Sequence, residues 1–348
     1  MSSLPPEPRG REDGRLRIGF TYNQKRIDPK KGGDDTEAEF DPPATIDAIA
    51  AALEKLGHEI VRLEATPDLM SRLATRPVDL VFNMAEAFHG RNREAQVPAM
   101  LEFLDLPFTG SDTGTMAVAL DKHLAKHVVA AAGVPTPASV VMYDGHEPLP
   151  ADLRFPVIAK PNAEGSSKGI HAKSVVEDEP ALRVLLAEMA PKFREGVLVE
   201  GYVTGREFTV GLLGDPHAPR VLPVMEVVFA PSAGPRPVYS FAHKLDYCDE
   251  VRYDCPPRDL APEHLARLEK AARDAYRALR CRDVARIDFR MDAEGTPWFI
   301  EANPLPGLTP KWSDLCMIAD AAGLNYDDLI AAITRPAIER CLARRRGA

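Results

Sequence analysis

Residues 285–304 read ARIDFRMDAEGTPWFIEANP, and this stretch decides the fold. Apolar residues alternate with charged ones on both sides of a short polar segment, 293–297, which contains Gly and Pro. Alternation with a period of two is typical of strands, and a Gly-containing polar segment between two such runs is typical of a turn. The sequence therefore predicts a β-hairpin with strands over 285–292 and 298–304.

The charged side chains of this hairpin are predicted to gather on one face, because side chains two apart share a face of a strand. A symmetric hairpin places Asp288 opposite Glu301, and Arg286 opposite Asn303. Carboxylate and amide oxygens are the ligands that Mg²⁺ takes when it also holds nucleotide phosphates, and a nearby arginine stabilises developing charge. The alternative is an ordinary hairpin with a surface ion pair, and a β-bulge would shift the register.

A second candidate site follows the apolar residues 155–160, which predict a short strand ending in Lys160. Small residues dominate the next segment, 161–169, and such loops let backbone N–H groups approach phosphate oxygens. A lysine at the strand end can reach the same phosphates as a point charge. The alternative is a plain Gly/Ser loop with a solvated lysine. Neither a G-x-x-x-x-G-K-[ST] nor a G-x-G-x-x-G motif is present, which excludes those two nucleotide-binding loops.

A third candidate site consists of two predicted strands, 197–203 and 206–211, around a tight turn. Each strand carries one acidic residue in apolar surroundings, Glu200 and Glu207. A carboxylate is rarely buried without a partner, and the amino group of adenine or the hydroxyls of ribose are suitable donors. The alternative is a pair of exposed carboxylates at strand ends with no function.

Together these motifs resemble the ATP-grasp superfamily and, within it, the D-alanine–D-alanine ligase family. The resemblance extends over residues 78–322, most of the chain. Its most specific motifs are EGSSKG at 164–169, GREFTV at 205–210, RID at 286–288, EAN at 301–303, and the Pro-Gly pair at 306–307. The resemblance implies an α/β fold, with an N-terminal parallel-sheet domain followed by a two-lobed ATP-grasp domain.

The resemblance also implies a role for individual residues. The residues implied to contact ATP are Lys122, Lys160, Ser167, Glu200, Tyr202, Val203, Glu207 and Lys244. Two Mg²⁺ ions, which Mn²⁺ can replace, are implied to bind Asp288, Glu301 and Asn303. The implied catalytic residues are Arg286, Ser166 and Lys244. The implied substrate contacts are Ser166, Arg286, Gly307, Leu245 and Trp312.

In this family a carboxylate attacks the γ-phosphoryl group of ATP, and an amine then displaces phosphate from the acylphosphate to form an amide. The resemblance therefore implies a ligase that releases ADP and phosphate, joins small-molecule amino acids, serves peptidoglycan biosynthesis and forms a homodimer. Two alternatives stay open. One is a specialised ATP-grasp ligase of natural-product or modified-peptide biosynthesis with a different amino-acid pair. The other is a nucleotide-binding relative without catalysis, against which the intact residues of the 285–304 hairpin argue.

Three departures from the family pattern concern the substrates. The first predicted strand runs into Tyr22, with no glutamate where the family binds the first amino acid; Glu37 or Glu39 could take its place. The family's tyrosine after the covering-loop lysine is replaced by Leu245. Trp312 stands near the position of a serine that holds the second substrate's carboxylate. We therefore expect that D-alanine is not the best substrate at both subsites.

Composition excludes other classes of protein. The 348 residues are 45% hydrophobic and 27% charged, which are globular values, and a net charge of −9 argues against a nucleic-acid partner. No run approaches the ~18 apolar residues of a membrane span, and the N-terminus lacks the apolar segment of a signal peptide. Five cysteines without a C-x-x-C pair favour a reduced, cytoplasmic location. His123 and His127 lie four apart, as on a solvated helix face, without a third metal ligand nearby.

The order of the elements predicts the domain organisation. Strands predicted at 16–21, 59–63 and 78–83 alternate with helices predicted at 43–56, 67–74 and 94–104, which indicates a parallel sheet. The expected parts are a disordered tail over 1–14, an N-terminal α/β domain over 15–110, a first ATP-grasp lobe over 111–194, and a second lobe with the metal-binding hairpin over 195–348.

Overall fold

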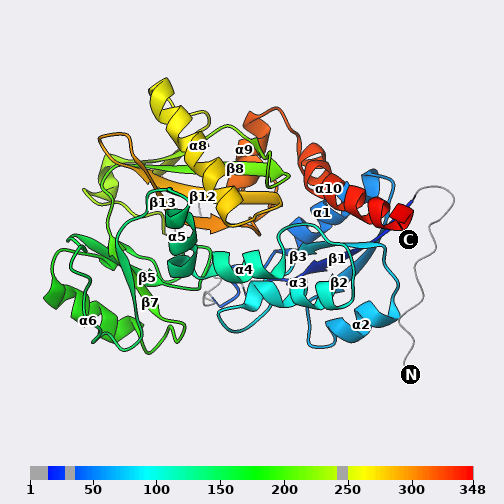
Figure 1. Cartoon of the computed structure of the whole chain (residues 1–348), viewed down its shortest axis with the longest axis horizontal. Helices are drawn as coiled ribbons and strands as arrows, with labels where there is room; N and C mark the ends of the chain where they lie inside the picture. Colours follow the sequence, from blue (N-terminus) through cyan, green and yellow to red (C-terminus); the bar gives the residue numbers. More distant parts are fainter. Residues whose placement is uncertain (1–14, 28–35, 241–249, 348) are drawn as a thin grey trace.

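The protein folds around three β-sheets, as a computed structural model of the chain shows (Figure 1). The structure describes residues 15–27, 36–240 and 250–347. The predicted disordered tail over 1–14 lies outside these residues, as do Lys244 and Leu245. The parallel first sheet lies at one end of the molecule in Figure 1, and the two remaining sheets lie at the other.

The first sheet has the strand order β2-β1-β3 and is parallel throughout, which confirms the predicted α/β class. Helices cover both of its faces, so β1 and β3 are apolar on both sides and read as near-continuous hydrophobic runs. Residues Ile18 and Phe82 pack toward α1, whereas Val81 packs toward α2 and α3. The elements are β1 (Arg17–Tyr22), α1 (Pro43–Lys55), β2 (Glu59–Glu64), α2 (Leu69–Thr75), β3 (Leu80–Met84) and α3 (Arg93–Phe103).

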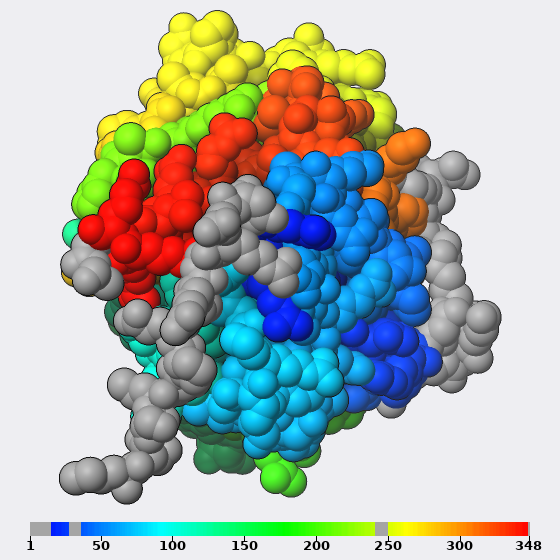
Figure 2. All heavy atoms as spheres, turned by 90° about the vertical axis from the view of Figure 1, so that its right-hand side faces the viewer, coloured from blue at the N-terminus to red at the C-terminus, as the bar shows by residue number. Residues whose placement is uncertain are grey.

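The C-terminal helix α10 (Tyr326–Gly347) returns to this first sheet and packs against α1. Leu329 and Ile333 of α10 join Ile49 of α1 in one buried cluster. Figure 2 shows the red residues of α10 beside the blue residues of the N-terminal unit. The two ends of the chain therefore share a core, and the division at residues 110 and 194 remains a prediction.

The second sheet is antiparallel with the strand order β4-β7-β5-β6, and it carries Lys160 on β5 and Glu200 on β7. Helix α6 covers its apolar face through Leu182 and Leu186. Helices α4 and α5 connect it to the first sheet. The elements are α4 (Thr113–Leu120), α5 (Lys122–Ala131), β4 (Ser139–Met142), β5 (Val157–Pro161), β6 (Val175–Val176), α6 (Glu179–Met189) and β7 (Val197–Gly201).

The third sheet has the strand order β11-β10-β8-β12-β13, with β9 paired to β8, and all of its pairings are antiparallel. The elements are β8 (Arg206–Gly214), β9 (Arg220–Val221), β10 (Met225–Phe229), β11 (Val251–Asp254), α8 (Pro262–Ala278), β12 (Asp283–Met291), β13 (Pro297–Asn303) and α9 (Asp314–Ala321).

The predicted hairpin is confirmed as β12 and β13. Asp288 pairs with Glu301 and Arg286 pairs with Asn303, as the symmetric arrangement predicts. A shift in the register follows Asp288, so the bulge lies on the turn side of the charged residues and leaves their pairing intact.

The backbone packs closely around Gly205 at the junction between β7 and β8. Gly205 has φ +151, and a Cβ atom there would lie 1.9 Å from the backbone oxygen of Met291. We predict that Gly205→Ala lowers the free energy of unfolding by about 3 kcal/mol, because backbone has to move to make room. Urea denaturation of the purified protein measures this change in the free energy of unfolding.

Gly57→Ala is the matched control, since Gly57 also has a positive φ of +90 but has open space around it. That substitution is expected to cost only about 1 kcal/mol of backbone strain. Equal losses for the two variants would contradict a close approach at Gly205.

Candidate active site

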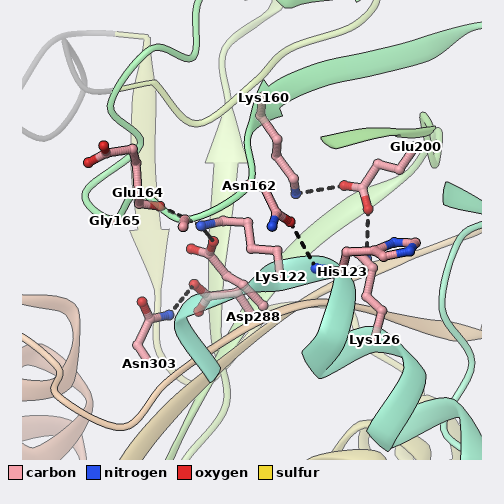
Figure 3. A network of polar contacts seen from close by, with 12 residues as sticks. Lys122, His123, Lys126, Lys160, Asn162, Glu164, Gly165, Glu200, Asp288 and Asn303 are labelled. Carbon is pink, nitrogen blue, oxygen red and sulfur yellow. Dashed lines mark hydrogen bonds and ion pairs between the residues drawn. The ribbon is translucent and has the colours of Figure 1, made fainter. Parts of the chain in front are cut away.

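The charged face of the hairpin forms a connected cluster. Asp288 receives two hydrogen bonds from Arg286, from Nε at 3.0 Å and from the terminal nitrogen at 2.9 Å. Asn303 Nδ2 donates to Asp288 at 3.1 Å, as Figure 3 shows, and Thr209 Oγ1 on the neighbouring strand β8 donates at 2.6 Å. The Asp288 carboxylate is therefore fixed by partners on three strands.

Arg286 is nearly buried, with 9% of its surface exposed. Burial alone would lower the pKa of its guanidinium, but the carboxylates of Asp288 and Asp314 outweigh burial and raise it. Asp314 lies 3.3 Å from Arg286. Sequence reasoning missed Asp314, whose only signal was its position in the first turn of the helix that follows the hairpin. The arginine therefore stays charged at any physiological pH.

Lys122 connects the hairpin to the segment after β5. Its Nζ lies 3.3 Å from Glu301 Oε2 and also donates to the backbone oxygen of Glu164. The start of α5 is held there by Asn162, whose side-chain oxygen accepts from His123 N–H at 3.0 Å (Figure 3). The predicted phosphate-contacting lysine thus lies beside a predicted metal ligand.

Glu200 is buried between two lysines, as Figure 3 shows. Lys160 Nζ and Lys126 Nζ each lie 2.6 Å from one of its oxygens. Burial would raise the pKa of Glu200, yet the two ammonium groups lower it overall. Burial lowers the pKa of Lys126 to about 8, against the pull of Glu200. Lys126 also donates to the Phe299 backbone oxygen at 3.0 Å, so this triad ties α5 to two sheets.

Sequence reasoning missed Lys126, although its spacing of four from Lys122 on a predicted helix could have revealed it. It also missed Arg290, which lies two residues after Asp288. The Arg290 guanidinium lies 4.6 Å from the centre of the Tyr202 ring and 3.8 Å from Glu207. Alternation along the strand was the available signal for Arg290.

The loop after β5 presents its two serines to different spaces. Ser166 and Ser167 both have left-handed backbones, with φ 50 and 57. Ser166 lines a large cavity of about 460 Å³, whereas Ser167 lines a smaller one of about 80 Å³. Glu301 and Tyr239 line both, so the two cavities meet at the hairpin.

The two cavities sort the predicted site residues into two groups. Those that line the smaller cavity are Lys160, Ser167, Glu200, Tyr202, Val203, Glu207 and Asp288. Those that line the larger cavity are Lys122, Ser166, Arg286, Asn303, Gly307 and Trp312. The structure therefore brings together every predicted site residue that it describes. The two remaining predicted residues, Lys244 and Leu245, lie outside the described residues.

The two acids named as substitutes for the missing glutamate differ in position. Glu39 lines the larger cavity and accepts hydrogen bonds from Gly165 N–H and Arg93, both at 2.6 Å. Glu37 instead accepts from backbone N–H groups, including that of Ile27 at 2.6 Å, and does not line the cavity. Only Glu39 is therefore placed to meet a substrate.

His123 and His127 pack ring against ring, 4.4 Å between centroids, on a partly exposed face of α5. His127 Nδ1 contacts the backbone oxygen of His123 at 2.8 Å. Within the described residues no acidic or cysteine side chain joins them as a metal ligand.

Comparison with known proteins agrees with this geometry. The family model described as D-ala D-ala ligase C-terminus matches residues 129–335. A D-alanine–D-alanine ligase of a Synechococcus species is 36% identical over 84% of this chain and 87% of its own length. The chain belongs to the D-alanine–D-alanine ligase family. The family predicted from the sequence is thereby confirmed, together with the enzyme class, an ATP-dependent ligase.

Other known proteins are also similar to this chain. A Sinorhizobium fredii protein described only as uncharacterized protein y4sG is 34% identical over 82% of this chain and 85% of its own. The crystal structure of a Bacillus anthracis D-alanine–D-alanine ligase complexed with ATP superimposes with a TM-score of 0.71 at 25% identity, covering 94% of this chain and 99% of the other. The VanG D-Ala:D-Ser ligase of Enterococcus faecalis, at 20% identity and TM-score 0.70, shares the fold. Among the described helices, none has the length and apolar character needed to cross a bilayer.

The buried triad of this ligase-family chain gives a testable prediction. We expect Lys126→Met to raise the KM for ATP by roughly tenfold to a hundredfold, the worth of a charged hydrogen bond, because Glu200 and Lys160 lose their fixed position. The KM for amino acids is expected to change little. Steady-state phosphate release with one substrate varied at a time separates the two effects.

Lys126→Arg keeps the charge and is expected to recover part of the ATP affinity. Lys173→Met is the matched control, because Lys173 forms an exposed ion pair with Glu188 at 3.0 Å in the same part of the chain. An unchanged KM for ATP in a folded Lys126→Met protein would contradict a positioning role.

Proposed function

We propose that the protein joins two amino acids through an amide bond at the expense of ATP, by way of an acylphosphate, as a D-alanine–D-alanine ligase-like enzyme. The observation that carries this proposal is the hairpin cluster of Arg286, Asp288, Glu301 and Asn303 at the junction of two cavities. The smaller cavity then receives the nucleoside and the larger one the reacting groups.

The nucleoside assignment is supported by an acceptor within the smaller cavity. Glu200 lines the smaller cavity, where its two oxygens each lie 2.6 Å from a lysine ammonium. We propose that adenine lies beside this residue, as the family resemblance implies. The half-buried carboxylate of Glu207 lines the same cavity and suits the hydroxyls of ribose.

The residues present also fit Mg²⁺. Asp288, Glu301 and Asn303 offer only oxygen ligands from one face of a hairpin, which is the ligand type that Mg²⁺ prefers. We propose that they hold two ions, as the family resemblance implies. Bound there, Mg²⁺ would neutralise phosphate charge and orient the terminal phosphoryl group.

The protein's own groups then position and stabilise the reacting charges. A substrate carboxylate oxygen bonds to the γ-phosphorus, and ADP leaves with the electrons of the bond that breaks. An amine nitrogen then bonds to the acyl carbon, the phosphate leaves, and the amine loses a proton. Arg286 and Lys122, both nearly buried beside the hairpin, stabilise the negative charge that develops on phosphoryl and acyl oxygens. Ser166 borders the same space from the small-residue loop.

The family resemblance extends the proposal to the biological setting. We propose a homodimer, a role in peptidoglycan biosynthesis and a cytoplasmic location. The last is supported by the free thiols of the four cysteines that the structure describes.

The nucleotide products test the reaction class. We predict that ATP is converted to ADP and phosphate, and only when both an amino-acid carboxylate and an amine are supplied. The reason is that the matched residues surround the γ-phosphoryl position and the acyl carbon. Chromatography of the nucleotides after reaction with a panel of amino-acid pairs measures it, and formation of AMP and pyrophosphate would contradict the proposal.

The metal assignment predicts severe losses on the hairpin. Glu301→Gln and Asp288→Asn are each expected to lower kcat by roughly a hundredfold or more, because an uncharged amide is a poor ligand for Mg²⁺. Steady-state kinetics at saturating Mg²⁺, with thermal unfolding to check the fold, measure the effect.

Glu294→Gln is the matched control, because it makes the same chemical change on an exposed residue at the turn of the same hairpin. Near-normal turnover in either site variant, or an equal loss in the control, would refute the metal assignment.

A further inference from the structure

Four carboxylates from three segments meet in one part of the larger cavity. Glu39 and Asp41 precede α1, Glu86 follows β3, and Glu94 lies on α3. Carboxylate oxygens of Glu39, Glu86 and Glu94 all lie within 4.8 Å of one another. We call these four residues the acidic corner.

The protein supplies fewer positive groups to this corner than the corner has carboxylates. Arg93 donates to Glu39 at 2.6 Å and lies 3.9 Å from Glu94, and it acts on Glu86 through its charge alone. The carboxylates of Asp41 and Glu86 accept no hydrogen bond from the described residues, although Lys25 acts on Asp41 through its charge. Asp41 is 8% exposed and faces the cavity. A buried carboxylate without a donor points to a ligand that supplies one.

The raised pKa values of the carboxyl groups in the acidic corner also agree with a cationic ligand. Burial raises the pKa of Asp41 to about 7, with Lys25 opposing it. Burial also raises the pKa of Glu94 to about 7, with Arg93 opposing it. The pKa of Glu86 is raised by burial and by the neighbouring charges of Glu94 and Glu39. The corner therefore carries carboxyl groups that a bound cation would help to ionise.

The larger cavity as a whole also has more acidic than basic side chains in its lining. Seven acidic side chains line it, and the basic ones among the described lining residues are Lys25, Lys122 and Arg286. Lys122 and Arg286 already lie within 3.3 Å of acids of the reaction centre, Glu301 and Asp314. For its four carboxylates the corner has Arg93 and the charge of Lys25, and it lies against the small-residue loop through the bond from Gly165 N–H to Glu39.

We infer that one of the two amino acids joined here is basic, with its α-ammonium and a side-chain ammonium both held in the acidic corner. Two carboxylates of the corner, Asp41 and Glu86, accept no hydrogen bond from the described residues, and a diamino acid brings two ammonium groups. The buried guanidinium of Arg93 beside Glu39 disfavours a divalent ion at the same place. This inference rests on the proposed ligase function and names the substrate class of that site.

The test compares basic amino acids with neutral ones of the same length. Ornithine is paired with norvaline and lysine with norleucine, in both D and L forms, with alanine as the second substrate and ADP release as the readout. The basic member is expected to show a kcat/KM higher by roughly tenfold or more, the worth of one charged hydrogen bond. Equal values for the basic and neutral members of both pairs, or best activity with D-alanine alone, would overturn the inference.

Two variants test whether the preference for a basic amino acid comes from the acidic corner. Glu86→Gln and Asp41→Asn remove charge without breaking any hydrogen bond found in the structure, so both proteins should fold. The variant at the carboxylate that holds the side-chain ammonium is expected to lose the preference for the basic substrate while keeping its rate with the neutral one. The variant at the carboxylate that holds the α-ammonium is expected to lose activity with both substrates, and each variant is expected to keep its KM for ATP. Glu37→Gln, from the same segment but turned toward the Ile27 backbone, is the control and is expected to behave as the unmodified protein.

The remaining outcomes are also decisive. An equal loss with basic and neutral substrates in both variants would mean that the corner holds only an α-ammonium. A Mn²⁺ ion that is bound by the nucleotide-free protein and lost in Glu86→Gln would mean that it holds a metal. Either result overturns the inference but leaves the ligase proposal intact. Failure of every amino acid to release ADP would instead refute the proposed function itself.

Discussion

The register between β12 and β13 is the constraint on which the rest of the site depends. It sets Asp288 against Glu301 and Arg286 against Asn303. Because side chains alternate along a strand, a slip by one residue would send one strand's polar set to the opposite face. Apolar packing prevents the slip: Ile287 and Phe289, which flank Asp288, are fully buried, and Ala302, between Glu301 and Asn303, is buried as well. The bulge after Asp288 lies on the side of the turn, so it leaves this pairing unchanged.

Buried charge is used in two opposite ways around this hairpin. Removing an ion from water costs several kcal/mol, and Glu200 offsets that cost with two ammonium groups at 2.6 Å. That triad joins α5 to two sheets beside the smaller cavity. In the acidic corner the described residues supply no hydrogen bond to Asp41 and Glu86, and burial raises the pKa of both carboxyl groups. We propose that the first arrangement positions a nucleotide and that the second binds a cationic substrate.

The hairpin and the parallel first sheet could be predicted from the sequence because both depend on local periodicity, whereas the two-lobed ATP-grasp part was expected from the family resemblance. Alternation of period two and a Gly-containing turn define β12 and β13, and the strand–helix alternation defines the parallel first sheet. The acidic corner could not be predicted, because Glu86 and Glu94 reach Glu39 only through the arrangement of three separate segments. Local sequence also could not separate Glu39 from Glu37, which lie two apart on the same segment but turn to different partners.

The central claim is that the hairpin cluster promotes transfer of the γ-phosphoryl group to a substrate carboxylate. The most direct measurement uses an amino acid whose carboxylate oxygens carry a heavy isotope, under conditions of single turnover. We predict that mass spectrometry finds one labelled oxygen in the inorganic phosphate, since the bridging oxygen of an acylphosphate leaves with the phosphate when the amine attacks. Label in AMP, or phosphate without label alongside a labelled amide product, would contradict the account.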